Sequence, residues 1–174
     1  MKRGKIRFWE AVLFSLLGAL MFVSKLALEF LPNVHMLGML TVLNTRLFRV
    51  KALIPVYIFV LLEGIYAGFG IWWFPYLYIW AILWAAAMLI PENMKPVALS
   101  FCFMAVCALH GFLYGTLYAP FQALAFGLDF KGTVSWIIAG LPYDAIHGVS
   151  NFFMGALVLP LYVPMKKAID KLYS

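Results

Sequence analysis

Polar side chains that interrupt the long apolar stretches of this sequence are the residues best suited to chemistry. Asp144, His147 and Asn151 follow one another at intervals of three and four residues, which places them on one face of a helix. His110 and Tyr114 are four residues apart and are stacked in the same way. Ionisable groups inside a membrane helix are unfavourable unless they are paired or solvated, so they usually mark a functional site.

Further polar residues stand near the ends of neighbouring apolar runs. Glu63 lies in a third apolar stretch, and Asn33 and His35 flank the turn that follows the first one. His35 fits a loop-bridging role as well as a ligand contact. Lys25 and Glu29 are also four residues apart, and the simplest expectation is that they pair with each other.

The composition excludes an ordinary soluble domain. The 174 residues are 66% hydrophobic and only 11% charged, whereas soluble domains are typically about 25% charged. A globule of this size cannot hide so much apolar surface from water, so lipid must surround much of it. We therefore expect an all-α, polytopic membrane protein with one domain over residues 1–174.

The spacing of apolar runs predicts six transmembrane helices. A spanning helix needs about 20 residues, or fewer where flanking side chains snorkel. Pro142 is a plausible first residue of the sixth helix, and residues 121–131 are expected to form a surface loop with some helical character. The N-terminal run resembles a signal peptide but lacks a small-x-small cleavage site, so we assign it to the first helix. The expected helices are 8–30, 34–48, 52–67, 75–90, 96–118 and 142–164.

The net charge of +6 is concentrated in short clusters between the apolar runs. This distribution is typical of topology signals rather than of nucleic-acid binding. Six crossings put almost all lysines and arginines on one side, whereas the opposite loops carry only Lys131 and Lys25 is at the outer end of the first helix. The prediction is a multi-pass protein of a prokaryotic plasma membrane with both termini in the cytoplasm. The residues on that side are Lys2, Arg3, Lys5, Arg7, Arg46, Arg49, Lys51, Lys95, Lys166, Lys167 and Lys171.

In this topology the polar groups of the helices gather in the outer half of the membrane. A channel or proton relay needs polar groups at many depths. A polar cup above an apolar floor instead favours capture of a small solute from outside.

Aromatic residues cluster at the same level. Trp72, Trp73, Tyr76, Tyr78 and Trp80 occupy positions where an interfacial aromatic belt is expected. Two adjacent tryptophans in a glycine-bounded loop also suit stacking on a flat ring. Both interpretations remain open, and we count Trp72, Trp73 and Tyr76 among the candidate binding residues.

Small residues form two ridges. Ala11, Ser15 and Ala19 recur every four residues on the first helix, and Gly111 and Gly115 form a GxxxG pair on the fifth. Such ridges allow close approach of another helix. Internal packing is the main expectation for the fifth helix, whereas internal packing and a partner contact are equally open for the first.

These features resemble the substrate-binding (S) components of energy-coupling factor transporters. Three stretches carry the resemblance, which covers nearly the whole chain: LPNVHMLGML, KALIPVYIFVLLEGIYAGFGIWWFPYLYIW and DAIHGVSNFFMGALVLPLY. The resemblance implies tight binding of a vitamin or related micronutrient at the outer face, with the loops 31–35 and 68–74 as gates.

The resemblance also implies partners. Members of this family join a transmembrane coupling protein and two ATPase subunits, and an Ala-xxx-Ala motif on the first helix contacts the coupling protein. Ala11, Ser15 and Ala19 match that motif, with serine replacing one alanine. The chain has no GxxxxGK[ST] phosphate loop, so partner subunits would use the ATP and this chain would carry no cofactor.

The substrate is predicted from charge and rings. Glu29, Glu63 and Asp144 outnumber Lys25, which favours a cationic solute or a neutral donor-rich one over a carboxylate. Aromatic neighbours suit a small heteroaromatic vitamin such as pyridoxine, hydroxymethyl-pyrimidine or thiamine. A cobalamin-type ligand is also compatible with a wide cup.

Three other functions stay open. A metal carrier would use His35, His110 and His147, although we expect no metal site. An intramembrane hydrolase would use Asp144, His147 and Ser150, but Ser150 points away from their helix face and no GxSxG elbow occurs. We therefore expect no catalytic residues and no enzyme. A structural subunit is the third alternative, and the two cysteines are expected to be buried and unpaired.

Overall fold

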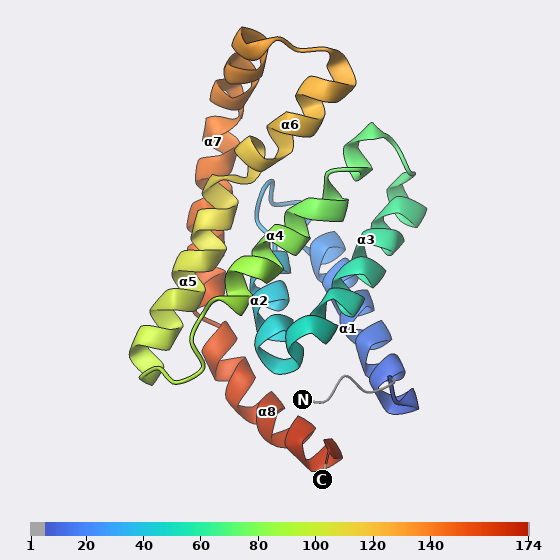
Figure 1. Cartoon of the computed structure of the whole chain (residues 1–174), viewed down its shortest axis with the longest axis vertical. Coiled ribbons are helices and arrows are strands. Elements are labelled where there is room, and N and C mark those ends of the chain that lie inside the picture. The colour runs from blue at the N-terminus through green and yellow to red at the C-terminus, as the bar shows by residue number, and fades with distance from the viewer. Residues whose placement is uncertain (1–5, 174) are drawn as a thin grey trace.

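The computed structural model describes residues 6–173, which form eight α-helices and two short 3-10 helices without any strand (Figure 1). Lys2, Arg3 and Lys5 lie outside the described residues. The helices are α1 (Phe8–Ala27), α2 (Leu37–Phe48), η1 (Arg49–Ala52), α3 (Leu53–Ala67), η2 (Ile71–Trp73), α4 (Tyr76–Met88), α5 (Pro96–Phe112), α6 (Tyr114–Phe126), α7 (Phe130–Gly155) and α8 (Val158–Tyr173).

Several helical stretches are long and apolar enough to cross a membrane. Among the described residues there are four, namely Phe8–Ala27, Leu37–Ala67, Ile71–Met88 and Pro96–Phe126, and α7 with α8 makes a fifth when this pair, bent by 46°, is counted as one span. These stretches confirm the all-helical class and fit a membrane protein. Six crossings remain a prediction, because α2 is only 12 residues long, or about 18 Å, and continues through η1 into α3.

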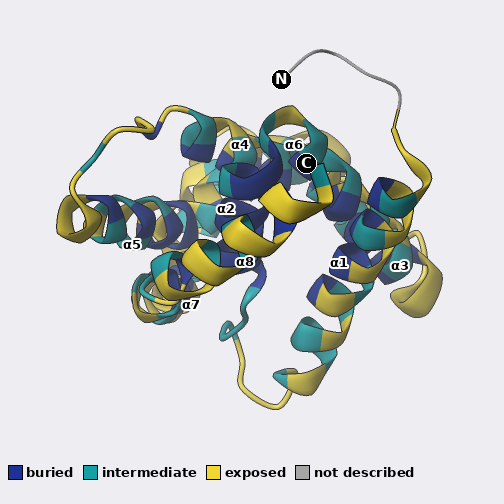
Figure 2. Ribbon diagram, turned by 90° about the horizontal axis from the view of Figure 1, so that it is seen from below, coloured by how far each residue is buried: buried dark blue, intermediate teal, exposed yellow. Residues whose placement is uncertain are grey.

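Helix α2 forms the centre of the molecule. All of its residues except Arg46 are buried, and it packs against α4, α5, α7 and α8. Figure 1 shows it between the α1–α3 pair and the α5–α7 pair. Seen from below, the helices turn their buried faces inward and leave exposed faces outward (Figure 2). Many of the exposed residues are large and apolar, such as Leu16 and Ile65, as expected for a surface in contact with lipid.

In two helix pairs, a glycine allows the two helices to approach each other closely. A Cβ at Gly18 of α1 would lie 2.6 Å from the Cγ2 atom of Ile58 in α3. A Cβ at Gly111 of α5 would lie 2.8 Å from the Cα atom of Gly148 in α7. The prediction of internal packing for the fifth helix is therefore confirmed at Gly111.

The C-terminal third differs from the predicted arrangement. The loop predicted at 121–131 is wrong over most of its length, since α6 continues to Phe126 and ends at Gly127, whose φ of 63° suits a left-handed cap. The helix predicted at 142–164 is also wrong. Helix α7 begins at Phe130 behind the cap residue Asp129, passes through Pro142 and ends at Gly155. Proline removes a single backbone hydrogen bond, and helices in membranes tolerate that loss, so Pro142 does not mark a helix start.

The helix predicted at 96–118 is interrupted. Helix α5 ends at Phe112 and α6 begins at Tyr114, with Leu113 between them. The ends of three other predicted helices shift by two or three residues: α1 ends at Ala27, α2 begins at Leu37 and α4 ends at Met88.

The two ends of the molecule differ in charge. The start of α1, the α2–α3 turn, the α4–α5 loop and the end of α8 lie at one end, whereas the α3–α4 and α6–α7 turns lie at the other (Figure 1). We call the first the basic end, because most described basic residues are there, and the second the aromatic end. Lys131 follows the α6–α7 turn at the aromatic end. Which end faces the cytoplasm remains a prediction.

Candidate functional site

Side chains from distant parts of the chain converge near the aromatic end. His35 precedes α2, and the centre of its ring lies 4.4 Å from that of His147 in α7. The Tyr114 ring at the start of α6 lies 4.8 Å from the His147 ring. These three residues come from segments that are far apart in the sequence, so the folded chain creates the contact.

Trp80 joins the other rings into one cluster. The centre of its ring lies 6.0 Å from that of His35, 5.5 Å from His110 and 5.9 Å from Tyr76. The Trp80 side chain is fully buried. We define the ring cluster as His35, Tyr76, Trp80, His110, Tyr114 and His147. All but Trp80 were candidate binding residues from the sequence, and the structure brings these five together.

The ring cluster contains buried polar atoms that have no hydrogen-bond partner within residues 6–173. They are Nδ1 of His35, Nε1 of Trp80, Nδ1 of His110 and Nε2 of His147. The other imidazole nitrogen of His110 lies 3.1 Å from the carbonyl oxygen of Ile79. An unsatisfied buried polar group is destabilising by about 1–3 kcal/mol. Four such groups in one place give the cluster hydrogen-bonding capacity that the protein does not use itself.

Asn151 extends this polarity by one turn of α7. It is fully buried, and neither its amide nitrogen nor its amide oxygen has a hydrogen-bond partner in the described part of the chain. A Cβ at Gly38 of α2 would lie 3.4 Å from the Asn151 amide, so the absence of a side chain at Gly38 leaves room for it. Asn151 follows His147 by four residues, so both side chains lie on the predicted face of α7, one turn apart.

Glu63 belongs to an ion pair between helices. Its fully buried carboxylate in α3 pairs with the Lys25 ammonium in α1, which is 30% exposed. The predicted pair of Lys25 with Glu29 is wrong, because the helix ends at Ala27 and leaves Glu29 in an exposed turn. Glu63 follows Phe59 by one turn of α3, and the Phe59 ring stacks on that of Tyr76 with 6.3 Å between their centres, so the pair borders the ring cluster.

Asp144 has a structural partner. Both of its carboxylate oxygens accept from the Gly115 N–H at 3.0 Å. Gly115 is the second residue of α6, where the N–H groups have no partner within the helix. The Asp144 carboxylate thus caps α6 and stabilises the break after α5.

The remaining candidate residues serve the loops around the cluster. Trp73 donates its indole N–H to the carbonyl of Val60 at 2.8 Å, which fixes it against α3. The Trp72 ring meets the edge of Tyr76, and its carbonyl accepts from the hydroxyl of Tyr118. Asn33 has a φ of 61°, and its carbonyl accepts from Ser150. These three residues shape the rim, and no contact brings the two indoles together as a stacked pair.

The surroundings of His35 keep its imidazole neutral. It lies in the loop between α1 and α2, and burial together with the neighbouring His147 and His110 lowers its pKa well below 6.5. A neutral imidazole has one donor and one acceptor nitrogen. His35 can therefore offer either type of hydrogen bond to a ligand at neutral pH.

Trp80 is the site residue that sequence reasoning missed. It was grouped with the interfacial aromatic belt, although it lies four residues after Tyr76 and thus on the same helix face. That spacing was the available signal. What places Trp80 in the site is that His35 and His110 both approach its indole. These are tertiary contacts, which the spacing in the sequence does not predict.

The alternative chemistries find little geometric basis. No group of three or more histidine, cysteine or acidic side chains able to hold a metal ion occurs among the described residues. The Ser150 hydroxyl donates to the carbonyls of Asn33 and His147, and Asp144 is bound to Gly115. The three residues of the hydrolase alternative therefore do not form a nucleophile–base–acid relay in this structure.

The small-residue ridge of α1 faces outward in part. Ala11 and Ser15 are exposed and Ala19 is half-buried, whereas Gly18 beside them packs on α3. The ridge itself is thus available to another helix.

Comparisons with protein-family models, curated proteins and solved structures give no match to this chain.

Proposed function

We propose that this chain is the substrate-binding membrane subunit of an energy-coupling-factor-type importer that takes up a vitamin or related micronutrient. The observation that carries the proposal is the ring cluster with its unpartnered buried donors and acceptors. In a membrane protein such groups are unfavourable unless they bind something. A polar heteroaromatic solute would satisfy the nitrogens and stack against the rings.

The ion pair and the helix cap refine the substrate class. Lys25 pairs with Glu63, the Gly115 N–H binds Asp144, and Glu29 is in an exposed turn, so none of these carboxylates is a member of the ring cluster. The remaining contacts are neutral imidazole, indole, phenol and amide groups. This set favours an uncharged heteroaromatic such as pyridoxine or hydroxymethyl-pyrimidine over the thiamine cation.

The mechanism follows from the two ends. The aromatic end faces outside and captures the solute, and both termini are in the cytoplasm of a prokaryotic cell. A transmembrane coupling protein docks on Ala11, Ser15 and Ala19, of which the first two are exposed. Two ATPase subunits then supply the energy for release inside, and this chain performs no catalysis.

Calorimetric titration of the purified chain with pyridoxine, hydroxymethyl-pyrimidine and thiamine tests the binding role. His147→Phe keeps a ring but removes the hydrogen bond, so we expect affinity to fall about ten-fold. Tyr143→Phe is the matched control, because it also keeps a ring and removes a polar atom, but at an exposed position of α7 outside the ring cluster, and its affinity should stay unchanged. The proposal fails if no vitamin binds and native mass spectrometry finds no small molecule bound to the purified chain.

Uptake in cells tests the partner interface separately. Ser15→Leu fills the exposed ridge, so uptake should stop while binding by the purified chain persists. Ala85→Leu places the same side chain at an exposed site on α4 and should transport normally. Normal transport by Ser15→Leu would show that the coupling protein docks elsewhere.

A further inference from the structure

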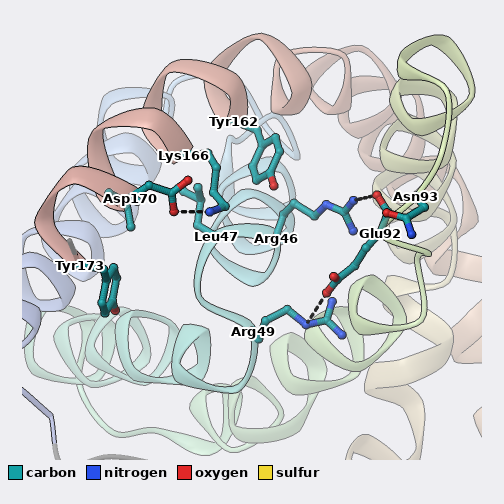
Figure 3. A pocket seen from close by; sticks show the side chains of 10 residues that line it. Arg46, Leu47, Arg49, Glu92, Asn93, Tyr162, Lys166, Asp170 and Tyr173 are labelled. Carbon is teal, nitrogen blue, oxygen red and sulfur yellow. Dashed lines mark hydrogen bonds and ion pairs between the residues drawn. The ribbon is translucent and has the colours of Figure 1, made fainter. Parts of the chain in front are cut away.

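A cavity of about 530 Å³ is lined by residues of the basic end, and Figure 3 shows their side chains. Arg46 of α2, Arg49 of η1 and Lys166 of α8 line it, together with Glu92 from the α4–α5 loop and Asp170 of α8. Three cations thus face two carboxylates. The rest of the lining is uncharged and consists of Leu47, Asn93, Tyr162, Ile169 and Tyr173.

Arg46 is held rigidly in this cavity. Its guanidinium donates to the carbonyls of Pro91 at 3.2 Å and of Glu92 at 2.8 Å. It also lies 6.0 Å from the centre of the Phe103 ring and 5.7 Å from that of Tyr162, within cation–π range. Its Nε atom is buried and has no partner within the described residues. A fixed guanidinium with a spare donor is preorganised to bind an anion.

Arg49 also has a spare donor. Its Nε atom lies 3.7 Å from the Glu92 carboxylate, which is too long for a hydrogen bond, and its buried Nη1 atom has no partner within residues 6–173. The backbone of Arg49 has a φ of 54°, a strained value for a residue other than glycine. Strain of this kind occurs at ligand sites.

We propose that this cavity binds a phosphate group, supplied by the headgroup of an anionic membrane lipid. Arginine guanidiniums match phosphate oxygens in geometry and charge. Basic cavities between membrane helices are also suited to lipid headgroups. Two exposed apolar side chains lie beside the arginines. Val50 follows Arg49 in the sequence, and Leu89 lies between Met88 and Ile90, whose carbonyls accept from Arg49 and Arg46. Both side chains offer contact to the acyl chains.

Lys166 completes the site from α8. Its ammonium pairs with Asp170 on the same helix, and the two side chains are 42% and 57% exposed, so this pair is weak and the lysine is able to turn toward a phosphate. Lys167 is the next residue of α8, is exposed and does not line the cavity. It therefore offers a control of equal charge at almost the same position.

Native mass spectrometry of the full chain in detergent tests the proposal, with phosphatidylglycerol and phosphatidylcholine of equal acyl chains as probes. Phosphatidylglycerol should bind more tightly, and Arg49→Gln and Lys166→Gln should each weaken it about five-fold. Lys167→Gln should bind as the unchanged chain does. Thermal unfolding checks that the variants are folded, and Lys166→Gln is at a surface position where no loss of folding is expected.

The outcomes separate the lipid from other sources of phosphate. Displacement of phosphatidylglycerol by millimolar inorganic phosphate in the unchanged chain but not in Lys166→Gln would support phosphate recognition with a soluble source. Equal binding of both lipids would overturn the proposal. It would also be overturned if Lys167→Gln lost as much affinity as Lys166→Gln, because binding would then reflect surface charge alone.

Discussion

The two partners of the Glu63–Lys25 ion pair are buried to different extents, so replacing one or the other should change the stability of the protein by different amounts. The Glu63 side chain is fully buried, whereas Lys25 is 30% exposed. A lysine without its partner can reach polar surroundings by extending its stem. A buried carboxylate without its partner has no such escape, so the two single substitutions should differ.

We predict that Lys25→Met lowers the free energy of unfolding by about 3 kcal/mol, because it leaves a buried charge unpaired. Glu63→Gln should have a smaller effect. The double variant Lys25→Met/Glu63→Gln should recover much of the loss, since neither charge remains. Denaturant unfolding in detergent measures all three, and a double variant as unstable as the sum of the singles would show that the pair is not coupled.

His35 makes a prediction about pH. Burial, His147 and His110 lower its pKa well below 6.5 in the folded protein, whereas the unfolded chain protonates it near 6.5. The unfolded state therefore binds more protons in this range, and stability is full above pH 6.5 and is lost as the pH falls. The unfolding temperature of the unchanged chain should decrease on acidification. In the His35→Phe variant it should decrease less steeply with falling pH. An unchanged slope would mean that His35 does not titrate on unfolding.

At the scale of helices, the α5–α7 crossing depends on two glycines that face each other. A Cβ at Gly111 would lie 2.8 Å from both the Cα and the nitrogen of Gly148. Those are backbone atoms, so no side-chain rotation relieves the clash. The helices would have to separate, and the separation would disturb His110 and His147 on either side of the crossing.

We predict that Gly111→Ala destabilises the protein by about 1–3 kcal/mol and also weakens vitamin binding. Gly140→Ala on α7 is the matched control, because nothing lies within 4 Å of its added Cβ. That control should stabilise the protein by about 0.5–1 kcal/mol through lower chain entropy. Thermal unfolding and calorimetry measure both effects, and equal stability of the two variants would contradict the close crossing.

At the scale of the whole molecule, the sequence predicted local patterns well and long-range partners poorly. Apolar runs gave the membrane-protein class, and helical spacing placed Asp144, His147 and Asn151 on one face of α7. The predicted partner of Lys25 was wrong, because spacing in the sequence favoured Glu29. Only the packing of α1 on α3 brings Glu63 close to Lys25. The role of Asp144 was not predicted for the same reason, since its partner is the backbone N–H of Gly115, which is far away in the sequence.

One buried carboxylate joins three distant parts of the chain at the basic end. Glu10 of α1 is 1% exposed. It accepts from Lys51 in η1 at 2.6 Å, from the Tyr173 hydroxyl at the end of α8, and from the Arg7 backbone at 2.9 Å. The C-terminal helix is thereby tied to the start of α1 and to the α2–α3 turn.

We predict that Glu10→Gln lowers the free energy of unfolding by about 3 kcal/mol, because it breaks a buried pair and leaves Lys51 uncompensated. Tyr173→Phe removes one hydrogen bond and should lower it by about 1 kcal/mol. Asp170→Asn is the control at the same end, since its pair with Lys166 is largely exposed, and it should change stability by less than about 0.5 kcal/mol. Hydrogen exchange should show that Glu10→Gln opens the end of α8 more than the α5–α7 pair. Equal opening of both would mean that Glu10 does not hold α8 locally but supports the molecule as a single cooperative unit.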